Sequence, residues 1–148
     1  MKDQPDTPAE LKTRALRLLV RREHSRAELV RKLLPHAESE AALNAVVDLL
    51  QSKKQLSDER FAEERARSLS RKYGSARIRH DLQSRGVSDE IADKASAGLN
   101  DLEKAREILQ RKYRVPATNR DEHAKRARFL QSRGFSYDVI RAVLKVEQ

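Results

Sequence analysis

Histidines, adjacent acidic pairs and serines are the groups from which this chain could build a catalytic or metal site. The chain has no cysteine, so thiolate ligands and disulfides are excluded. Its four histidines share no spacing typical of metal ligands, and each lies in a polar stretch. We therefore expect all four to be exposed and without a metal: His24, His36, His80 and His123.

The acidic pairs and the serines carry no catalytic pattern either. Adjacent carboxylates on a helix point in different directions, so Asp89-Glu90 and Asp121-Glu122 are better explained as first-turn residues near the positive end of a helix dipole. No serine lies in a Gly-x-Ser-x-Gly sequence, and no glycine-rich phosphate loop is present. We predict that the chain is not an enzyme and that it has no catalytic, cofactor or metal site.

Basic residues are the remaining groups in this chain that could form a functional surface. There are 32 Lys and Arg against 23 Asp and Glu, a formal net charge of +9, and the excess is largest after residue 100. Such a charge favours a polyanionic partner. Many of the cations come in clusters near predicted helix ends, where they also suit the helix dipole. One cluster alone could be an ordinary solvated face, whereas several aligned clusters would form a basic track.

The elements that position these residues are predicted to be helices throughout. Thr7-Pro8-Ala9-Glu10 and Ser25-Arg26-Ala27-Glu28 are capping boxes. Ser57 and Asn100 are further caps, and Gly74 is expected to end a helix before Ser75 caps the next. Apolar residues follow helical spacing, and no useful segment alternates as a strand would. The fold class is therefore all-α.

A nearly identical seven-residue sequence occurs at 82–88 and at 130–136, which predicts a structural unit used more than once. Each copy predicts a helix that ends at a glycine, Gly86 or Gly134, and a following helix capped by Ser88 or Ser136. We expect three tandem three-helix repeats, at 8–52, 57–98 and 100–146. Stacked in order, they would form an elongated, curved, solenoid-like body.

Three side chains near these corners leave alternatives open. The arginine before each corner glycine, Arg85 or Arg133, could bind the preceding helix carbonyls or pair with a neighbouring repeat. Phe129 lies off the apolar face of its helix, so it is either an exposed anchor for a partner or a filler between repeats.

Three ordered blocks of sequence resemble the bacterial regulatory protein RecX family. They are the stretch from Ala15 to Leu29, the Leu56-Ser57-Asp58-Glu59-Arg60-Phe61-Ala62 block with Tyr73 to Ile78, and the stretch from Phe129 to Ser136. The resemblance covers nearly the whole chain. It implies a fold of three tandem three-helix repeats and a regulator of DNA repair, homologous recombination and the SOS response.

The resemblance also implies a partner, the RecA recombinase filament. RecX-like proteins lie in the filament groove and mostly inhibit its ATPase, strand-exchange and co-protease activities. The resemblance does not say which basic residues make the contact. From the basic clusters of the sequence we predict that seven residues contribute to the contact face: Arg71, Lys72, Arg77, Arg111, Lys112, Lys125 and Arg126. Single- or double-stranded DNA is a further predicted partner through the same basic face.

An alternative is a stand-alone helical nucleic-acid-binding protein that uses the two corners as helix–turn–helix readers. Acidic residues at the start of both candidate recognition helices, Asp89-Glu90 and Asp138, count against it. No apolar run is long enough to span a bilayer, and the first residues do not resemble a signal peptide. We expect a cytoplasmic monomer with no membrane partner.

Overall fold

The structure, a computed structural model, describes residues 4–147. Within this range it holds nine α-helices and one short 3₁₀ turn, with no strand. In chain order the elements are α1 (Pro8–Arg21), α2 (Arg26–Leu33), η1 (Leu34–His36), α3 (Glu40–Ser52), α4 (Asp58–Leu69), α5 (Ser75–Ser84), α6 (Asp89–Ala97), α7 (Asp101–Lys112), α8 (Arg120–Ser132) and α9 (Tyr137–Glu147).

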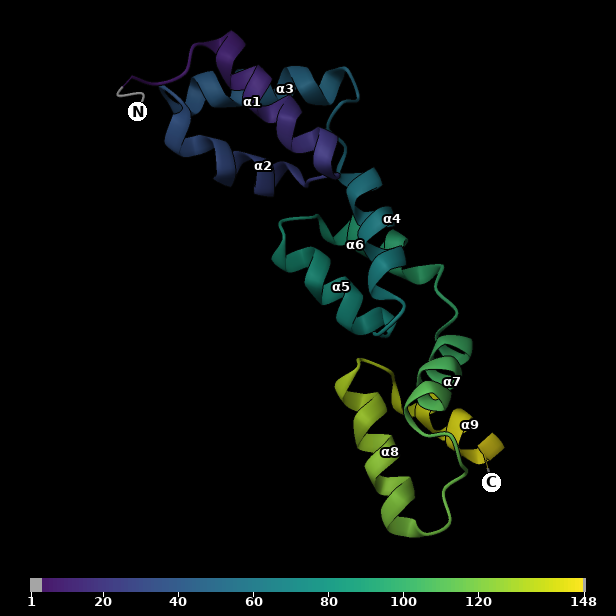
Figure 1. Cartoon of the computed structure of the whole chain (residues 1–148). Helices are drawn as coiled ribbons and strands as arrows, with labels where there is room; N and C mark the ends of the chain where they lie inside the picture. Colours follow the sequence, from purple (N-terminus) through teal and green to yellow (C-terminus); the bar gives the residue numbers. More distant parts are fainter. Residues whose placement is uncertain (1–3, 148) are drawn as a thin grey trace.

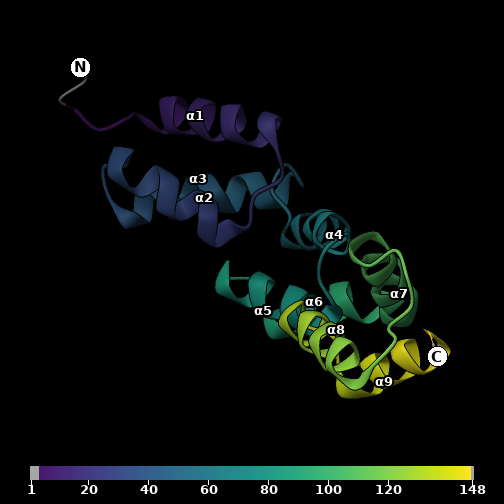
Figure 2. The same cartoon turned by 60° about the horizontal axis from the view of Figure 1, so that its bottom comes forward.

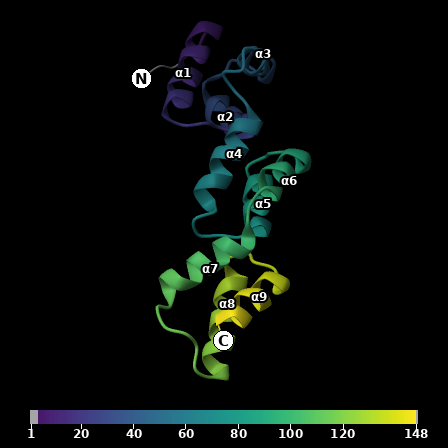
Figure 3. The ribbon, with the colours of Figure 1, turned by 90° about the vertical axis from the view of Figure 1, so that its right-hand side faces the viewer.

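The helices form three groups of three that follow one another in a curved row (Figures 1 and 3). Figure 2 shows the same helices from another side, with α1 and α9 at opposite ends of the body. Each group has its own apolar cluster, centred on Leu29 and Val47, on Ile78 and Leu82, or on Leu109 and Leu130. The predicted all-α fold of three tandem three-helix repeats is thus confirmed. Leu56, which the predicted boundaries left between repeats, belongs to the first cluster.

The predicted helix starts are largely as expected. Thr7 and Ser25 form capping boxes with Glu10 and Glu28, and Ser57, Ser88 and Asn100 accept a hydrogen bond from the third residue of their helices. The prediction for Ser75 is wrong by one residue, because Gly74 is the N-cap of α5 and makes no side-chain cap. The Ser75 hydroxyl instead donates to Asp101 Oδ2 at 2.6 Å, across the boundary to the next repeat.

The repeated seven residues form the corners that join the repeats. Gly86 and Gly134 have φ of +86° and +91°, the left-handed backbone that glycine adopts readily. Both also approach the preceding repeat closely: a Cβ on Gly86 would overlap the Ala27 side chain in α2, and one on Gly134 would overlap Arg77 in α5. The same sequence thus ends a helix and docks that corner onto the repeat before it.

Both joints use the same two polar contacts. The carbonyl before each corner glycine accepts a hydrogen bond from the N-cap of the earlier repeat's second helix, Ser25 Oγ to Arg85 O and Gly74 N to Arg133 O, each at 2.7 Å. The first helical residue of the next repeat, Asp58 in α4 or Asp101 in α7, then accepts from the first backbone N–H of that second helix, at 2.7 and 3.2 Å. Each carboxylate therefore lies at two helix N-termini, that of its own helix and that of the earlier repeat's second helix, and its negative charge is favourable at both.

Candidate basic interaction surface

The joint between the second and third repeats carries a basic groove of about 410 Å³, which we call the second-joint groove. One wall is the turn that follows α4, and the others come from α7 and from the end of α8. Its lining residues are Arg71, Lys72, Ile108, Arg111, Lys112, Phe129 and Arg133. Four of the seven predicted contact residues are therefore brought together in one place.

The charge of this groove is not compensated within the described chain. None of its seven lining residues is acidic. Among residues 4–147, none of the five lining cations forms an ion pair with a carboxylate. Arg111 donates to the backbone carbonyl of Arg71, which ties α7 to the turn after α4. Five positive groups thus converge on one hollow that is lined by no carboxylate.

Aromatic rings hold some of these cations in place. The Arg133 guanidinium lies 5.5 Å from the centre of the Tyr73 ring and 5.1 Å from that of Phe129, so it bridges two repeats. Lys112 Nζ lies 5.2 Å from the Phe129 ring centre. Phe129 is half-buried against the third cluster and also lines the groove. A guanidinium stacked by its face leaves the N–H groups at its edge available as donors.

The other three predicted residues lie elsewhere. Arg77 is exposed, stacks 4.1 Å from the Tyr73 ring centre and donates to the Ser132 carbonyl at 2.7 Å, so it helps to hold the second joint. Lys125 is exposed on α8, outside the residues that line the groove. Arg126 is only 4% exposed and stacks 4.5 Å from the Tyr113 ring centre. It is therefore enclosed within the third repeat and does not belong to the exposed basic face.

The joint between the first and second repeats has a groove at the corresponding place, of about 170 Å³, which we call the first-joint groove. Its lining residues are Arg22, Glu23, Phe61, Glu64, Arg65 and Ser68. Counted from the N-caps Ser25 and Gly74, Arg22 and Glu23 occupy the positions of Arg71 and Lys72. Counted from Asp58 and Asp101, Arg65 and Ser68 occupy those of Ile108 and Arg111. The same place in the fold is thus neutral in one joint and strongly basic in the other.

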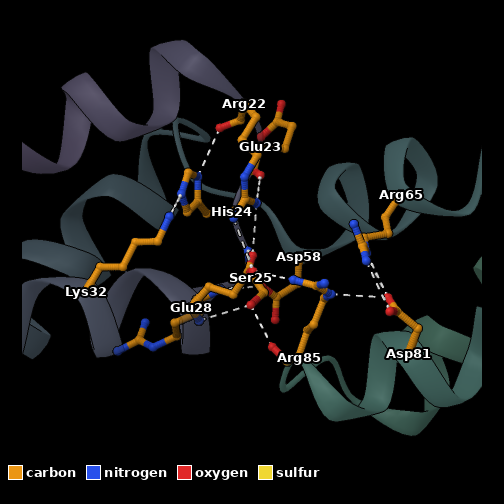
Figure 4. A network of polar contacts seen from close by, with 11 residues as sticks. Arg22, Glu23, His24, Ser25, Glu28, Lys32, Asp58, Arg65, Asp81 and Arg85 are labelled. Carbon is orange, nitrogen blue, oxygen red and sulfur yellow. Dashed lines mark hydrogen bonds and ion pairs between the residues drawn. The ribbon is translucent and has the colours of Figure 1, made fainter. Parts of the chain in front are cut away.

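Ion pairs bind the cations of the first joint (Figure 4). Glu28 accepts from Arg22 at 3.2 Å and, across the joint, from Arg85 at 2.9 Å. Asp81 accepts from Arg85 at 3.2 Å and from Arg65 at 2.7 Å. Arg85 therefore pairs with the neighbouring repeat, as one of the two predicted alternatives had it.

Burial alone would raise the pKa of Glu28, whose side chain is 8% exposed. Hydrogen bonds from Arg22, the Ser25 N–H and Arg85 outweigh burial and lower the pKa of Glu28 to about 2. The same competition lowers the pKa of Asp81, where burial is opposed mainly by the hydrogen bond from Arg65. Both carboxyl groups are ionised at neutral pH and hold the arginines in the joint.

His24 corrects the expectation that all four histidines are exposed, because it is 1% exposed beside the first joint. Its Nδ1 lies 3.0 Å from the Arg22 carbonyl, which can only accept, so Nδ1 carries the proton. Nε2 then accepts from Lys32 Nζ at 2.9 Å. Burial, together with the nearby Arg22 and Lys32 charges, lowers the pKa of His24, although the Arg22 carbonyl opposes this. A neutral imidazole fits both contacts.

Arg133 is not among the predicted contact residues, and Phe129 is predicted to be either an anchor for a partner or a filler between repeats. The signal that could have indicated their place in the groove is the register of the repeats, which aligns Arg133 with Arg85 and Tyr73 with His24. The second joint also lacks a counterpart to Glu28, since Arg77 occupies the third helical position of α5 where Glu28 occupies that of α2.

The corners do not form free helix–turn–helix readers, because each is docked on the preceding repeat. Over residues 4–147 there is no group of three or more His, Asp or Glu side chains able to hold a metal ion. No helix in that same part of the chain is both long and apolar enough to cross a membrane.

Comparisons with known proteins agree with this architecture along the whole row of repeats. Three family models match in order: the first, second and third three-helix domains of RecX, at residues 12–50, 57–95 and 100–144. Curated proteins named Regulatory protein RecX are similar in sequence. The one from Leptothrix cholodnii is 45% identical, covering 92% of this chain and 88% of its own. The one from Chromobacterium violaceum is 47% identical, covering 90% and 88%.

Solved structures show the same fold. The crystal structure of RecX from Lactobacillus salivarius superposes with a TM-score of 0.82 at 24% identity, covering 95% of this chain and 96% of that one. A second crystal structure, of a regulatory protein RecX, gives a TM-score of 0.80 at 21% identity, covering 93% of this chain and 73% of the other.

Proposed function

The chain belongs to the RecX family of regulatory proteins, and we propose from this premise that it binds the filament of the RecA recombinase and restrains its activities. The role is one of binding rather than catalysis. Restrained activities would include ATP hydrolysis, strand exchange and co-protease activity, through which the chain would regulate DNA repair and the SOS response.

The observation that carries the proposal, beside family membership, is an uncompensated basic groove on an elongated body. A row of three repeats can follow a helical groove that a compact sphere could not enter (Figure 1). The five unpaired cations of the second-joint groove would meet acidic side chains or DNA phosphates there. Such contacts give fast association and a strong dependence on salt.

A RecA ATPase assay on single-stranded DNA tests the proposal, with the purified chain added at increasing ratios to a bacterial RecA. We expect inhibition that weakens as salt is raised. Inhibition far below one copy per RecA subunit would indicate capping of growing filaments, and inhibition that requires stoichiometric amounts of the chain would indicate occupation of the groove. ATP hydrolysis that stays unchanged at an excess of the chain would contradict the proposal.

A further inference from the structure

The two joint grooves differ in charge, although the two joints are built in the same way. Both lie at the same place in the repeat, but the first-joint groove contains two arginines and two glutamates, whereas the second-joint groove contains five cations and no acid. The first joint pairs its arginines with carboxylates, so a joint of this fold can be built with its charges neutralised. Crowding five unpaired cations is unfavourable until an anion binds them.

We infer that the second-joint groove binds the sugar–phosphate backbone of a single-stranded nucleic acid, an inference that rests on the proposed function for its biological setting. The groove side chains provide only hydrogen-bond donors and apolar surface: arginines, lysines, Ile108 and Phe129. A nucleic-acid backbone presents phosphate oxygens, which need only donors. A polypeptide segment also presents N–H groups, for which these side chains offer no acceptor.

The aromatic residues favour a single strand. Basic grooves with interleaved rings and guanidinium planes are typical of proteins that bind single strands, because bases can stack there while phosphates meet the cations. Arg133, positioned between Tyr73 and Phe129, provides such a plane. With no acceptor among its side chains, the groove cannot read base edges fully, so little sequence preference is expected.

The test is a fluorescence anisotropy titration of the full chain with a labelled oligothymidylate of about 20 nucleotides, at several salt concentrations and without RecA. The informative variant is Arg71→Gln/Lys72→Gln, because both side chains are exposed and neither forms an ion pair with residues 4–147. The matched control is Arg31→Gln/Lys53→Gln, which removes the same charge from exposed positions of the first repeat. Circular dichroism checks that both variants fold.

Each phosphate contact on a single strand adds about 0.7 to the slope with which the logarithm of the binding constant falls against the logarithm of the salt concentration. Loss of two contacts should therefore weaken binding by roughly 25-fold at about 0.1 M salt and reduce the slope by about 1.4, with less than about 3-fold weakening for the control. Equal effects of the two variants would overturn the inference. So would unchanged binding of the oligonucleotide with lost binding of an acidic polypeptide such as polyglutamate, which would assign the groove to protein carboxylates. The titration contains no RecA, so its outcome is separate from that of the ATPase assay.

Discussion

Replacing Glu28 by glutamine removes the charge at the centre of the first joint while keeping its shape. The Glu28 carboxylate accepts from Arg22, from Arg85 of the next repeat and from the Ser25 N–H. Glutamine can still accept from the Ser25 N–H, but it leaves both arginines without their shared counter-charge. The substitution therefore tests whether the first joint is held by its ion pairs.

The pKa of Glu28 gives the magnitude. A fall from the ordinary value of 4.5 to about 2 corresponds to about 3 kcal/mol of stabilisation at neutral pH. The side chains of Arg22 and Arg85 are 43% and 33% exposed. In the variant, water therefore hydrates both guanidinium groups and offsets part of the lost stabilisation. We expect the variant to lose about 2–3 kcal/mol of unfolding free energy at pH 7, below the range for a fully buried pair.

The pH dependence follows from the sign of the shift. Because the folded pKa lies below the ordinary one, the stabilisation is complete above about pH 4.5 and is lost as the pH falls towards about 2. Urea unfolding followed by circular dichroism at pH 7 and at about pH 2.5 should show the gap between wild type and variant shrinking to under about 1 kcal/mol. Glu63→Gln, at an exposed carboxylate, is the control and should cost less than about 0.5 kcal/mol. A gap that does not change with pH, or a control as damaging as the variant, would refute the reasoning.

Two further predictions concern the second joint and the buried histidine. Gly134→Ala should lower the unfolding free energy by about 2 kcal/mol or more, because residue 134 has φ +91° and a Cβ there meets Arg77. Gly98→Ala, with open space around its Cβ, should be neutral or stabilising by up to about 1 kcal/mol, and similar losses in thermal unfolding of both variants would contradict this account. The lowered pKa of His24 predicts that the folded imidazole, seen as the Nδ1–H form in nitrogen-15 NMR spectra, takes up its second proton at a lower pH than in the urea-unfolded chain, and that stability falls as the pH drops below 6.5, where the unfolded chain takes up a proton first. A folded-state titration midpoint at or above that of the unfolded chain would refute it.

The helices and corners could be predicted from the sequence because the residues that determine them are close together along the chain. Capping boxes at Thr7 and Ser25 and the glycines of the two corners depend on neighbouring residues alone. Contacts between repeats are not local, and two expectations that depended on them, for Ser75 and for His24, were wrong. The Ser75 hydroxyl binds Asp101, 26 positions away, and His24 is buried beside a joint formed partly by the next repeat.

The candidate site was predictable only in part for the same reason. Arg71-Lys72 and Arg111-Lys112 were visible as basic pairs, but their convergence depends on how the third repeat docks on the second. Arg126 belongs to an equally basic run, yet its position on α8 places its side chain inside the third repeat, against Tyr113. Charge alone did not separate the exposed cations from the enclosed one.

The central claim is that the second-joint groove, and not basic charge in general, contacts the RecA–DNA filament. It is tested by the RecA ATPase assay with three proteins: the wild type, Arg71→Gln/Lys72→Gln, and Arg31→Gln/Lys53→Gln. We predict that the half-inhibitory concentration rises roughly 10-fold or more for the groove variant at about 0.1 M salt and changes less than about 3-fold for the control. Equal inhibition by all three proteins would contradict the claim.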